Sequence, residues 1–228
     1  MACTTPQVSY DWVVRTEVVG DTALQLEGLR DFDDAVALLC ERIRDGGDPR
    51  WFEDRCPMFG TIWPAARALA RRVAAPDGPG PGARVLELGC GLALPSLVAA
   101  RRGAAVLATD QHPDAAARLA RNAARNGVRV DFAALDWRDP VPDDAAGYDW
   151  VLASDVLYAA GMAELLLGTF ARWLAPGGRG VLADPGRPWL QDFAVAAEAA
   201  GFRVALDCTP DDVFLLELTR PGRSPSGR

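Results

Sequence analysis

The sequence predicts an α/β fold in which a mostly parallel sheet lies between layers of helices. Three observations lead to this prediction. Short apolar runs alternate with longer amphipathic segments over residues 64–219, as in strand–helix–strand units. The run at 84–88 leads directly into Gly89-Cys90-Gly91 and a helical segment, and glycines allow the backbone to turn sharply beside a ligand. Asp110 ends the next run, about 20 residues on, where a carboxylate can accept both hydroxyls of a ribose. These features are typical of a unit that binds a nucleoside cofactor.

Residues 1–58 precede this unit and are predicted to form a hairpin followed by a helix. Segments 10–19 and 22–29 are rich in Val, Leu and Thr, and Gly20-Asp21 between them forms a turn. Asp31 or Asp33 can cap a helix that ends near residue 44. This extension either covers an edge, contributes to a substrate pocket, or serves packing alone.

Pro64 suits the first turn of a helix over residues 64–73, just upstream of the glycine turn. The N-terminus of that helix is therefore expected beside the ligand, with Trp63 as a candidate wall of the site. Core packing is an equally good interpretation of Trp63. Residues 75–82, rich in Pro and Gly, are expected to be a flexible connection.

The remainder of the chain supplies the other layers. The predicted helices span residues 113–126, 161–174 and 189–200, and the predicted strands span 129–135, 148–155, 179–184, 202–207 and 213–219. The last two strands are spaced as an antiparallel pair. With the strands at 84–88 and 106–110, this gives a seven-stranded sheet. Residues 221–228 are predicted to be a disordered tail, and residues 59–220 the cofactor-binding domain.

Composition excludes several classes of function. The net charge is −7 and every basic residue is arginine, and such an acidic chain is unsuited to sequence-independent binding of nucleic acid or anionic membranes. No apolar run is long enough to span a membrane, and no signal pattern begins the sequence. The cysteines show no C-x-x-C pair, so a cytoplasmic location is expected. His112 is the single histidine, so no metal site is expected. A monomer is favoured.

The glycine turn distinguishes between cofactors. A dinucleotide site prefers G-x-G-x-x-G, but the position of the third glycine is occupied here by Leu94. Glu87 instead completes an E-x-G-x-G pattern that resembles class I S-adenosylmethionine-dependent methyltransferases. The resemblance implies a Rossmann-like seven-stranded sheet with an antiparallel last strand, and S-adenosyl-L-methionine as the cofactor. The residues expected to bind it are Trp63, Glu87, Gly89, Cys90, Gly91, Asp110, Gln111, Asp136, Trp137 and Ser154.

Four further motifs narrow the resemblance. Trp63-Pro64, Leu94-Pro95, Asp136-Trp137 and the D-x-x-Y pattern from Asp155 to Tyr158 together resemble the family-16 methyltransferases, formerly labelled nicotinamide N-methyltransferase-like. The match covers residues 59–219. One departure is Ala93, where many members have glycine. We expect a right-handed helical conformation there, which alanine tolerates.

The narrower resemblance implies methylation of a protein side chain, most simply lysine. Asp136 is then the expected ligand of the adenine amino group, with Trp137 stacking on the ring or covering the sheet edge. Asp155 and Tyr158 are the expected catalytic residues: Asp155 hydrogen-bonds the acceptor amine and Tyr158 walls the pocket. Alternatively, Asp155 caps the helix that follows it. Arg187 either binds an acceptor carboxylate or, ranked first, pairs with Asp184. A small-molecule N- or O-methyltransferase and a non-catalytic S-adenosylmethionine-binding module are the alternative functions, and a dehydrogenase is weaker still.

Overall fold

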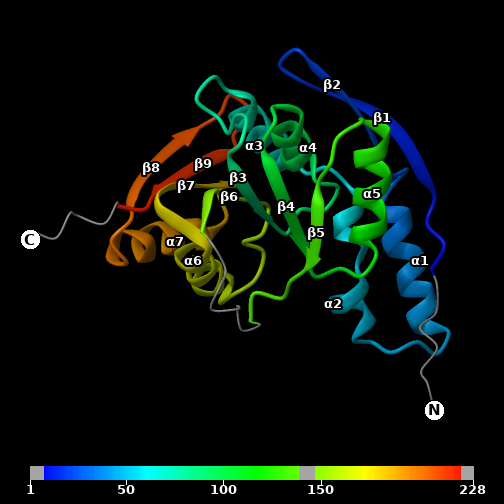
Figure 1. Ribbon diagram of the computed structural model, residues 1–228. Helices are drawn as coiled ribbons and strands as arrows, with labels where there is room; N and C mark the ends of the chain where they lie inside the picture. The colour runs from blue at the N-terminus through cyan, green and yellow to red at the C-terminus, as the bar shows by residue number, and fades with distance from the viewer. Residues whose placement is uncertain (1–7, 139–146, 222–228) are drawn as a thin grey trace, which may run out of the picture.

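A seven-stranded sheet forms the centre of the molecule (Figure 1), whose computed structural model describes residues 8–138 and 147–221. Its strands, in spatial order, are β5 (Asp131–Ala134), β4 (Ala105–Asp110), β3 (Arg84–Leu88), β6 (Tyr148–Ser154), β7 (Leu174–Asp184), β9 (Phe214–Thr219) and β8 (Arg203–Cys208). The first five strands are parallel to one another, whereas β9 runs antiparallel to both β7 and β8. The predicted Rossmann-like sheet is therefore confirmed. Residues 222–228 of the predicted tail lie outside the described residues.

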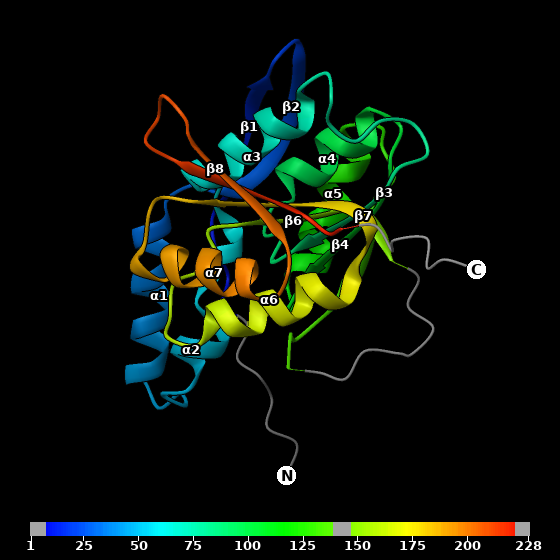
Figure 2. The ribbon, with the colours of Figure 1, turned by 90° about the vertical axis from the view of Figure 1, so that its left-hand side faces the viewer.

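Helices cover both faces of the sheet (Figure 2). One layer contains α3 (Pro64–Ala74), α4 (Leu94–Arg101) and α5 (Ala115–Arg125), and the other contains α6 (Met162–Trp173) and α7 (Pro188–Ala199). Successive residues of a strand point to opposite faces. Accordingly, Val85 packs in the α3–α5 layer, while Leu86 and Leu88 pack in the α6–α7 layer. This two-sided burial explains why the central strands are continuous apolar runs.

The fifth parallel strand is longer than predicted. β7 begins at Leu174, and the residues Pro176-Gly177-Gly178, interpreted as a helix stop, lie within it. Gly177 N–H donates to the Arg220 carbonyl at 2.9 Å, and Arg220 N–H donates to the Gly178 carbonyl at 3.1 Å. Arg220 thus extends β7 by pairing with Gly177 and Gly178, and no local signal in the sequence reveals this pairing.

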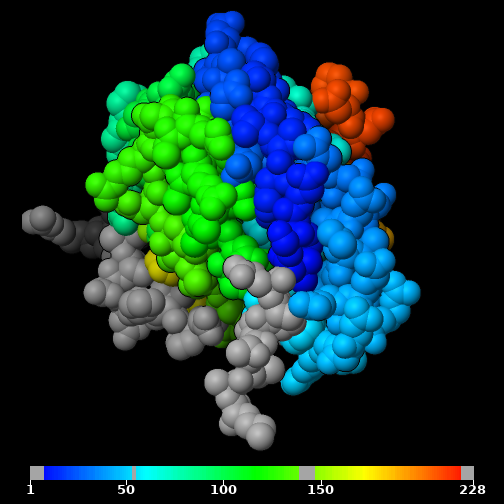
Figure 3. Space-filling view, turned by 90° about the vertical axis from the view of Figure 1, so that its right-hand side faces the viewer, coloured from blue at the N-terminus to red at the C-terminus, as the bar shows by residue number. Residues whose placement is uncertain are grey.

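The N-terminal region contains the predicted hairpin and helix, followed by two short helices that were not predicted. β1 (Trp12–Val19) and β2 (Thr22–Leu29) form an antiparallel hairpin, followed by α1 (Phe32–Arg44), α2 (Trp51–Arg55) and the 3₁₀ helix η1 (Pro57–Gly60). Asp31 is the cap of α1, since its Oδ1 accepts from Asp34 N–H at 3.0 Å. Figure 3 shows the hairpin as a dark blue strip between the green surface of α5 and the lighter blue of α1 and α2. A domain division at residue 58 stays a prediction.

Two asparagines of α5 dock the hairpin by its outer edge. Asn122 Oδ1 accepts from Glu27 N–H and Asn126 Oδ1 accepts from Gln25 N–H, both at 2.8 Å. Asn126 Nδ2 also donates to the Gln25 carbonyl at 2.8 Å. Side-chain amides one helical turn apart therefore replace a neighbouring strand, which protects an otherwise open edge.

Two features are absent from the part of the chain that the structure describes. Within residues 8–138 and 147–221, no helix is long and apolar enough to cross a membrane. In the same ranges, no group of three or more His, Cys, Asp or Glu side chains is arranged to hold a metal ion.

Candidate active site

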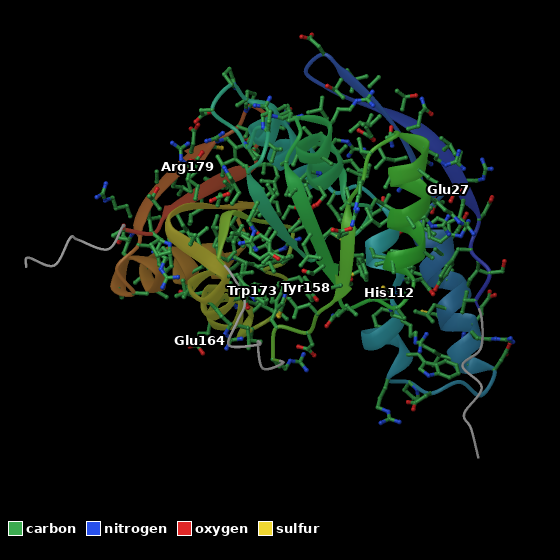
Figure 4. All side chains as sticks on the ribbon, viewed as in Figure 1. Glu27, His112, Tyr158, Glu164, Trp173 and Arg179 are labelled. Atoms are coloured by element: carbon green, nitrogen blue, oxygen red, sulfur yellow. The ribbon has the colours of Figure 1, made fainter. Side chains whose placement is uncertain are left out.

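The candidate site lies where the strand order reverses. β3 pairs with β4 on one side and β6 on the other, and ligands of open α/β sheets bind beyond the carboxyl ends of such strands. Figure 4 shows His112 and Tyr158 near the lower ends of β4 and β5, at this edge of the sheet. The segments that contain Gly89, Asp110 and Asp155 each follow or end one of these strands.

The backbone of the glycine turn leaves no room for larger residues. Gly89 has φ +65°, and a Cβ there would lie 2.9 Å from Val156 Cγ1 and 3.8 Å from Trp137 Cζ2. Gly91 has φ +52°, and a Cβ there would lie 3.2 Å from the Phe59 carbonyl oxygen. The turn is therefore enclosed by the segments after β5 and β6 on one side and by η1 on the other.

The expectation for Ala93 was wrong. Its φ of 60° and ψ of 36° are left-handed, not right-handed, and it is the N-cap of α4. An L-residue in this conformation places its Cβ close to the following carbonyl. This is the physical reason for a glycine at this position in related loops, and alanine occupies it here under strain.

Glu87 contacts α4 from within the core. It is 1% exposed, and its Oε2 accepts hydrogen bonds from Ser96 N–H at 3.0 Å and from the Ser96 hydroxyl. Burial raises the pKa of Glu87 to about 8, with a smaller contribution from Asp110 and opposition from the Ser96 hydrogen bonds. Its Oε1 is buried with no hydrogen-bond partner among the described residues. The carboxyl group thus anchors the first turn of α4 and retains a free acceptor atom.

Asp110 is held at the end of β4 by two backbone amides. Its Oδ2 accepts from Gly91 N–H at 2.9 Å and its Oδ1 from His112 N–H at 2.8 Å. The side chain is therefore fixed against the glycine turn, while each carboxylate oxygen keeps a second lone pair. This geometry suits recognition of a ribose.

His112 packs under this acid rather than acting as an exposed base. Its ring stacks on Phe59 with 4.1 Å between centroids, and its Nδ1 accepts from Asp114 N–H at 3.2 Å. Burial lowers the pKa of His112. Its buried Nε2 has no hydrogen-bond partner among the described residues. The sequence did not indicate the Phe59–His112 stack, because its partners are far apart in the chain.

The other predicted cofactor residues occupy different parts of this edge. Cys90 is buried and donates its N–H to the Thr109 carbonyl at 2.9 Å, so it links the turn to β4. Gln111 is exposed and Ser154 is buried at the end of β6. Asp136 Oδ1 accepts from Arg138 N–H at 2.9 Å in the turn after β5. Trp137 lies close to Gly89 together with Val156, as described above.

Trp63 lies at the other side, against the N-terminal region. Its Nε1 donates to the Met58 carbonyl at 3.1 Å, and its ring meets Phe32 edge to face at 5.2 Å. These contacts fit the packing interpretation, and a role as cofactor wall stays a prediction.

Asp155 does not cap the helix that follows it. Its Oδ2 accepts from Ala65 N–H at 3.2 Å in the first turn of α3, and its Oδ1 accepts from Arg187 Nη2 at 3.0 Å. Burial raises the pKa of Asp155, against the opposing effect of Arg187. We alternatively expected Asp155 to cap the helix that follows it, but it accepts a hydrogen bond from the first turn of α3. The sequence could not indicate α3, because only the tertiary fold brings α3 to the end of β6.

Arg187 pairs with Asp184, as ranked first from the sequence, but also reaches Asp155. Its Nη1 lies 2.9 Å from Asp184 Oδ2 and its Nη2 lies 3.0 Å from Asp155 Oδ1. The guanidinium therefore joins the ends of β6 and β7.

Tyr158 stands at the surface of the site. Tyr158 is 47% exposed to solvent. Burial of the hydroxyl end, and then the negative charge of Asp110, raise the pKa of Tyr158. The Tyr158 hydroxyl is therefore within the electrostatic influence of the predicted ribose acid, and the residue remains accessible from outside.

Comparison with known proteins agrees with this geometry. Residues 85–178 match a family model described as a methyltransferase domain. The chain is similar in structure to a 16S rRNA N2 G1207 methyltransferase of T. thermophilus, with a TM-score of 0.59, 18% identity, and coverage of 95% of this chain and 52% of that one. Residues 85–178 thus resemble a methyltransferase domain, and the chain has the fold of the class I methyltransferases, whose methyl donor is S-adenosylmethionine.

Three relatives are similar in sequence. A protein N-terminal and lysine N-methyltransferase of Eremothecium gossypii is 34% identical over 62% of this chain and 63% of its own length. An electron transfer flavoprotein β-subunit lysine methyltransferase of Danio rerio is 28% identical over 79% of this chain and 68% of its own. A ubiquinone biosynthesis O-methyltransferase of Xylella fastidiosa is 30% identical over 55% of this chain and 50% of its own. The chain spans less than two thirds of the first of these relatives.

Proposed function

We propose that this chain is an S-adenosylmethionine-dependent methyltransferase of the family-16 kind that methylates a lysine side chain of a protein. The observation that carries the proposal is the meeting of the Gly89–Gly91 turn, Asp110 and Val156 of the Asp155–Tyr158 segment at the switch point of the sheet. When bound, S-adenosylmethionine supplies a methyl group that is attached to a sulfonium sulfur. The amine nitrogen of the acceptor attacks the methyl carbon, and the bond from this carbon to the sulfur breaks.

The chain's own residues would position the two reactants. Asp110, fixed by Gly91 and His112, would accept the ribose hydroxyls, and the turn at Gly89 would approach the cofactor closely. Asp136 and Trp137 would contact the adenine. Positioning of this kind can provide most of the acceleration of a displacement reaction.

The acceptor side of the site favours a cation. Asp184 is buried, the Asp155 side chain is 9% exposed, and the two acids share the guanidinium of Arg187, so this part of the site keeps an excess of negative charge. Tyr158 offers an exposed aromatic face nearby, and such faces attract ammonium groups. A lysine ammonium would be drawn in, lose its proton to water through Asp155, and attack as the neutral amine.

A small-molecule acceptor is the second candidate. The similarity to a ubiquinone biosynthesis O-methyltransferase favours it, whereas the two lysine methyltransferases match a larger part of this chain. A non-catalytic cofactor-binding module is the third. We further infer a monomeric, cytoplasmic protein without a nucleic-acid partner.

Isotope transfer tests the proposal. The protein is incubated with S-adenosylmethionine labelled in the methyl group and a lysate of its source cells, and labelled peptides are sequenced by mass spectrometry. Label on lysine, absent with the Asp110→Ala variant, supports the proposal. Label confined to small molecules would assign the second candidate, and cofactor binding without any transfer would assign the third.

A further inference from the structure

We propose that Arg187 is a positioning residue of the methyl-transfer site: it holds Asp155 so that the Asp155–Tyr158 segment and the first turn of α3 keep one geometry around the acceptor. This inference rests on the proposed function and adds a residue to its machinery.

Hydrogen bonds hold both carboxylate oxygens and the backbone N–H of Asp155. Its two carboxylate oxygens accept from Arg187 and Ala65 as described, and its own N–H donates to the Ala183 carbonyl at 3.0 Å. Its side chain is 9% exposed. The residue therefore has little freedom to turn toward a substrate without losing one of these contacts.

The backbone at Asp155 also needs this support. Its φ is +59°, a left-handed conformation that a residue with a Cβ adopts at a cost in free energy. Strain of this kind persists only when the surroundings fix it, and it is concentrated at functional sites. The conformation directs the chain from β6 into Val156, which faces Gly89, and on to Tyr158.

Arg187 is itself held in place by hydrogen bonds to Asp184. Its N–H donates to Asp184 Oδ1 at 2.7 Å and its Nη1 donates to Asp184 Oδ2 at 2.9 Å. The Asp184 side chain is fully buried. A planar guanidinium clamped on one acid presents its other edge to a second acid in a set direction.

The charges around Asp155 come from three elements. Among the described residues, Arg187 precedes α7, Asp184 ends β7, and the Ala65 amide belongs to the positive end of α3. Loss of the guanidinium leaves Asp155 beside a like charge with only the amide to oppose it. Its protonated form would then persist to higher pH, and its hydrogen bond to Ala65 would weaken.

A double-mutant cycle tests the inference, with Arg187→Met, Asp155→Asn and the combined variant, and with Arg187→Lys as the conservative replacement. Arg203→Met, an exposed arginine on β8, is the control. The binding of S-adenosylhomocysteine, the exchange rate of the Ala65 amide, and kcat, KM and their pH profiles are measured.

For Arg187→Met we expect nearly unchanged binding of S-adenosylhomocysteine, faster exchange at Ala65, and a kcat lowered by about 10-fold or more, since a displacement of 1 Å can cost roughly 10²-fold. The acid limb of the pH profile should move up by about 1–3 pH units. Arg187→Lys should recover part of kcat. In the Asp155→Asn background, Arg187→Met should add little.

The inference would be overturned by unchanged Ala65 exchange and kcat in Arg187→Met, or by additive losses in the combined variant. Equal losses of cofactor affinity and kcat would also overturn it, since they indicate a general structural defect. The exchange and binding measurements need no acceptor, so they remain informative if the wild-type protein transfers no methyl group, which would contradict the proposed function instead.

Discussion

The carboxylate of Asp110 is hydrogen-bonded to the backbone of Gly91, with 2.9 Å between Oδ2 and the amide nitrogen. This contact joins the end of β4 to the turn after β3. It places the predicted ribose acid at a fixed distance from the loop that approaches the cofactor. The consequences of removing it can be measured.

Asp110→Ala should weaken the binding of S-adenosylmethionine by about 1–3 kcal/mol, because charge-assisted hydrogen bonds to the ribose and the support of the turn are both lost. Isothermal calorimetry measures the effect. Asp131→Ala, an exposed acid on the neighbouring strand β5, is the control and should bind normally. Unchanged affinity in Asp110→Ala would rule out the ribose assignment.

The left-handed conformation of Ala93 predicts an unusual response to glycine. Ala93 and Ala99 are both buried, at 1% and 0% exposure, so each loses a buried methyl group on replacement by glycine. Only at residue 93 does glycine also relieve a strain of about 1–2 kcal/mol. Denaturation should show that Ala93→Gly costs at least about 1 kcal/mol less than Ala99→Gly. Equal costs would show that the turn is not strained.

The buried Glu87 predicts a pH dependence of stability. Since its pKa in the folded protein is raised from 4.5 to about 8, the folded state keeps this proton while the unfolded state loses it. The associated stability is complete below the unfolded pKa and is lost as pH rises to about 8. Glu87→Gln cannot ionise and escapes this loss.

The free energy of unfolding of Glu87→Gln should therefore rise relative to wild type between pH 4.5 and 8, by at most roughly 5 kcal/mol. Urea denaturation of the cofactor-free protein across this range measures the difference. Glu164→Gln, at an exposed position of α6, should show none. A difference that is constant with pH would mean that Glu87 titrates normally.

The asparagine pair of α5 predicts a local weakness in the hairpin. Asn126→Leu keeps the side-chain volume but leaves the Gln25 amide and carbonyl without their partners. An unsatisfied group costs about 1–3 kcal/mol when buried, so stability should fall by about 2 kcal/mol. Hydrogen exchange should accelerate at Gln25. Ala120→Leu, at an exposed position of the same helix, should leave that amide protected.

Local patterns were sufficient for most of the elements. Gly20-Asp21 marked the hairpin turn, Pro64 the start of α3, and the apolar run at 84–88 the central strand, because each signal depends on neighbours within a few residues. Boundaries that depend on distant pairing were missed, as at Leu174, where β7 begins opposite Tyr148.

In the candidate site, too, some features could be predicted from local spacing and others depend on the tertiary fold. Glu87, Gly89, Gly91 and Asp110 were recognisable because their spacing along one βαβ unit encodes their meeting. The Phe59–His112 stack, the link from Asp155 to Ala65 and the bridge from Arg187 to Asp155 join residues that are far apart in the sequence. No pattern of spacing could reveal them.

By itself, the sequence determined the class of fold, the nucleoside-binding unit and the identity of its acids, since periodicity, turn chemistry and short motifs act over a few residues. The tertiary structure alone decided what those acids contact. Strand order brings the ends of β4, β6 and β7 and the N-terminus of α3 to one edge, and burial there sets which oxygen atoms are occupied, which backbone is strained and which proton is retained.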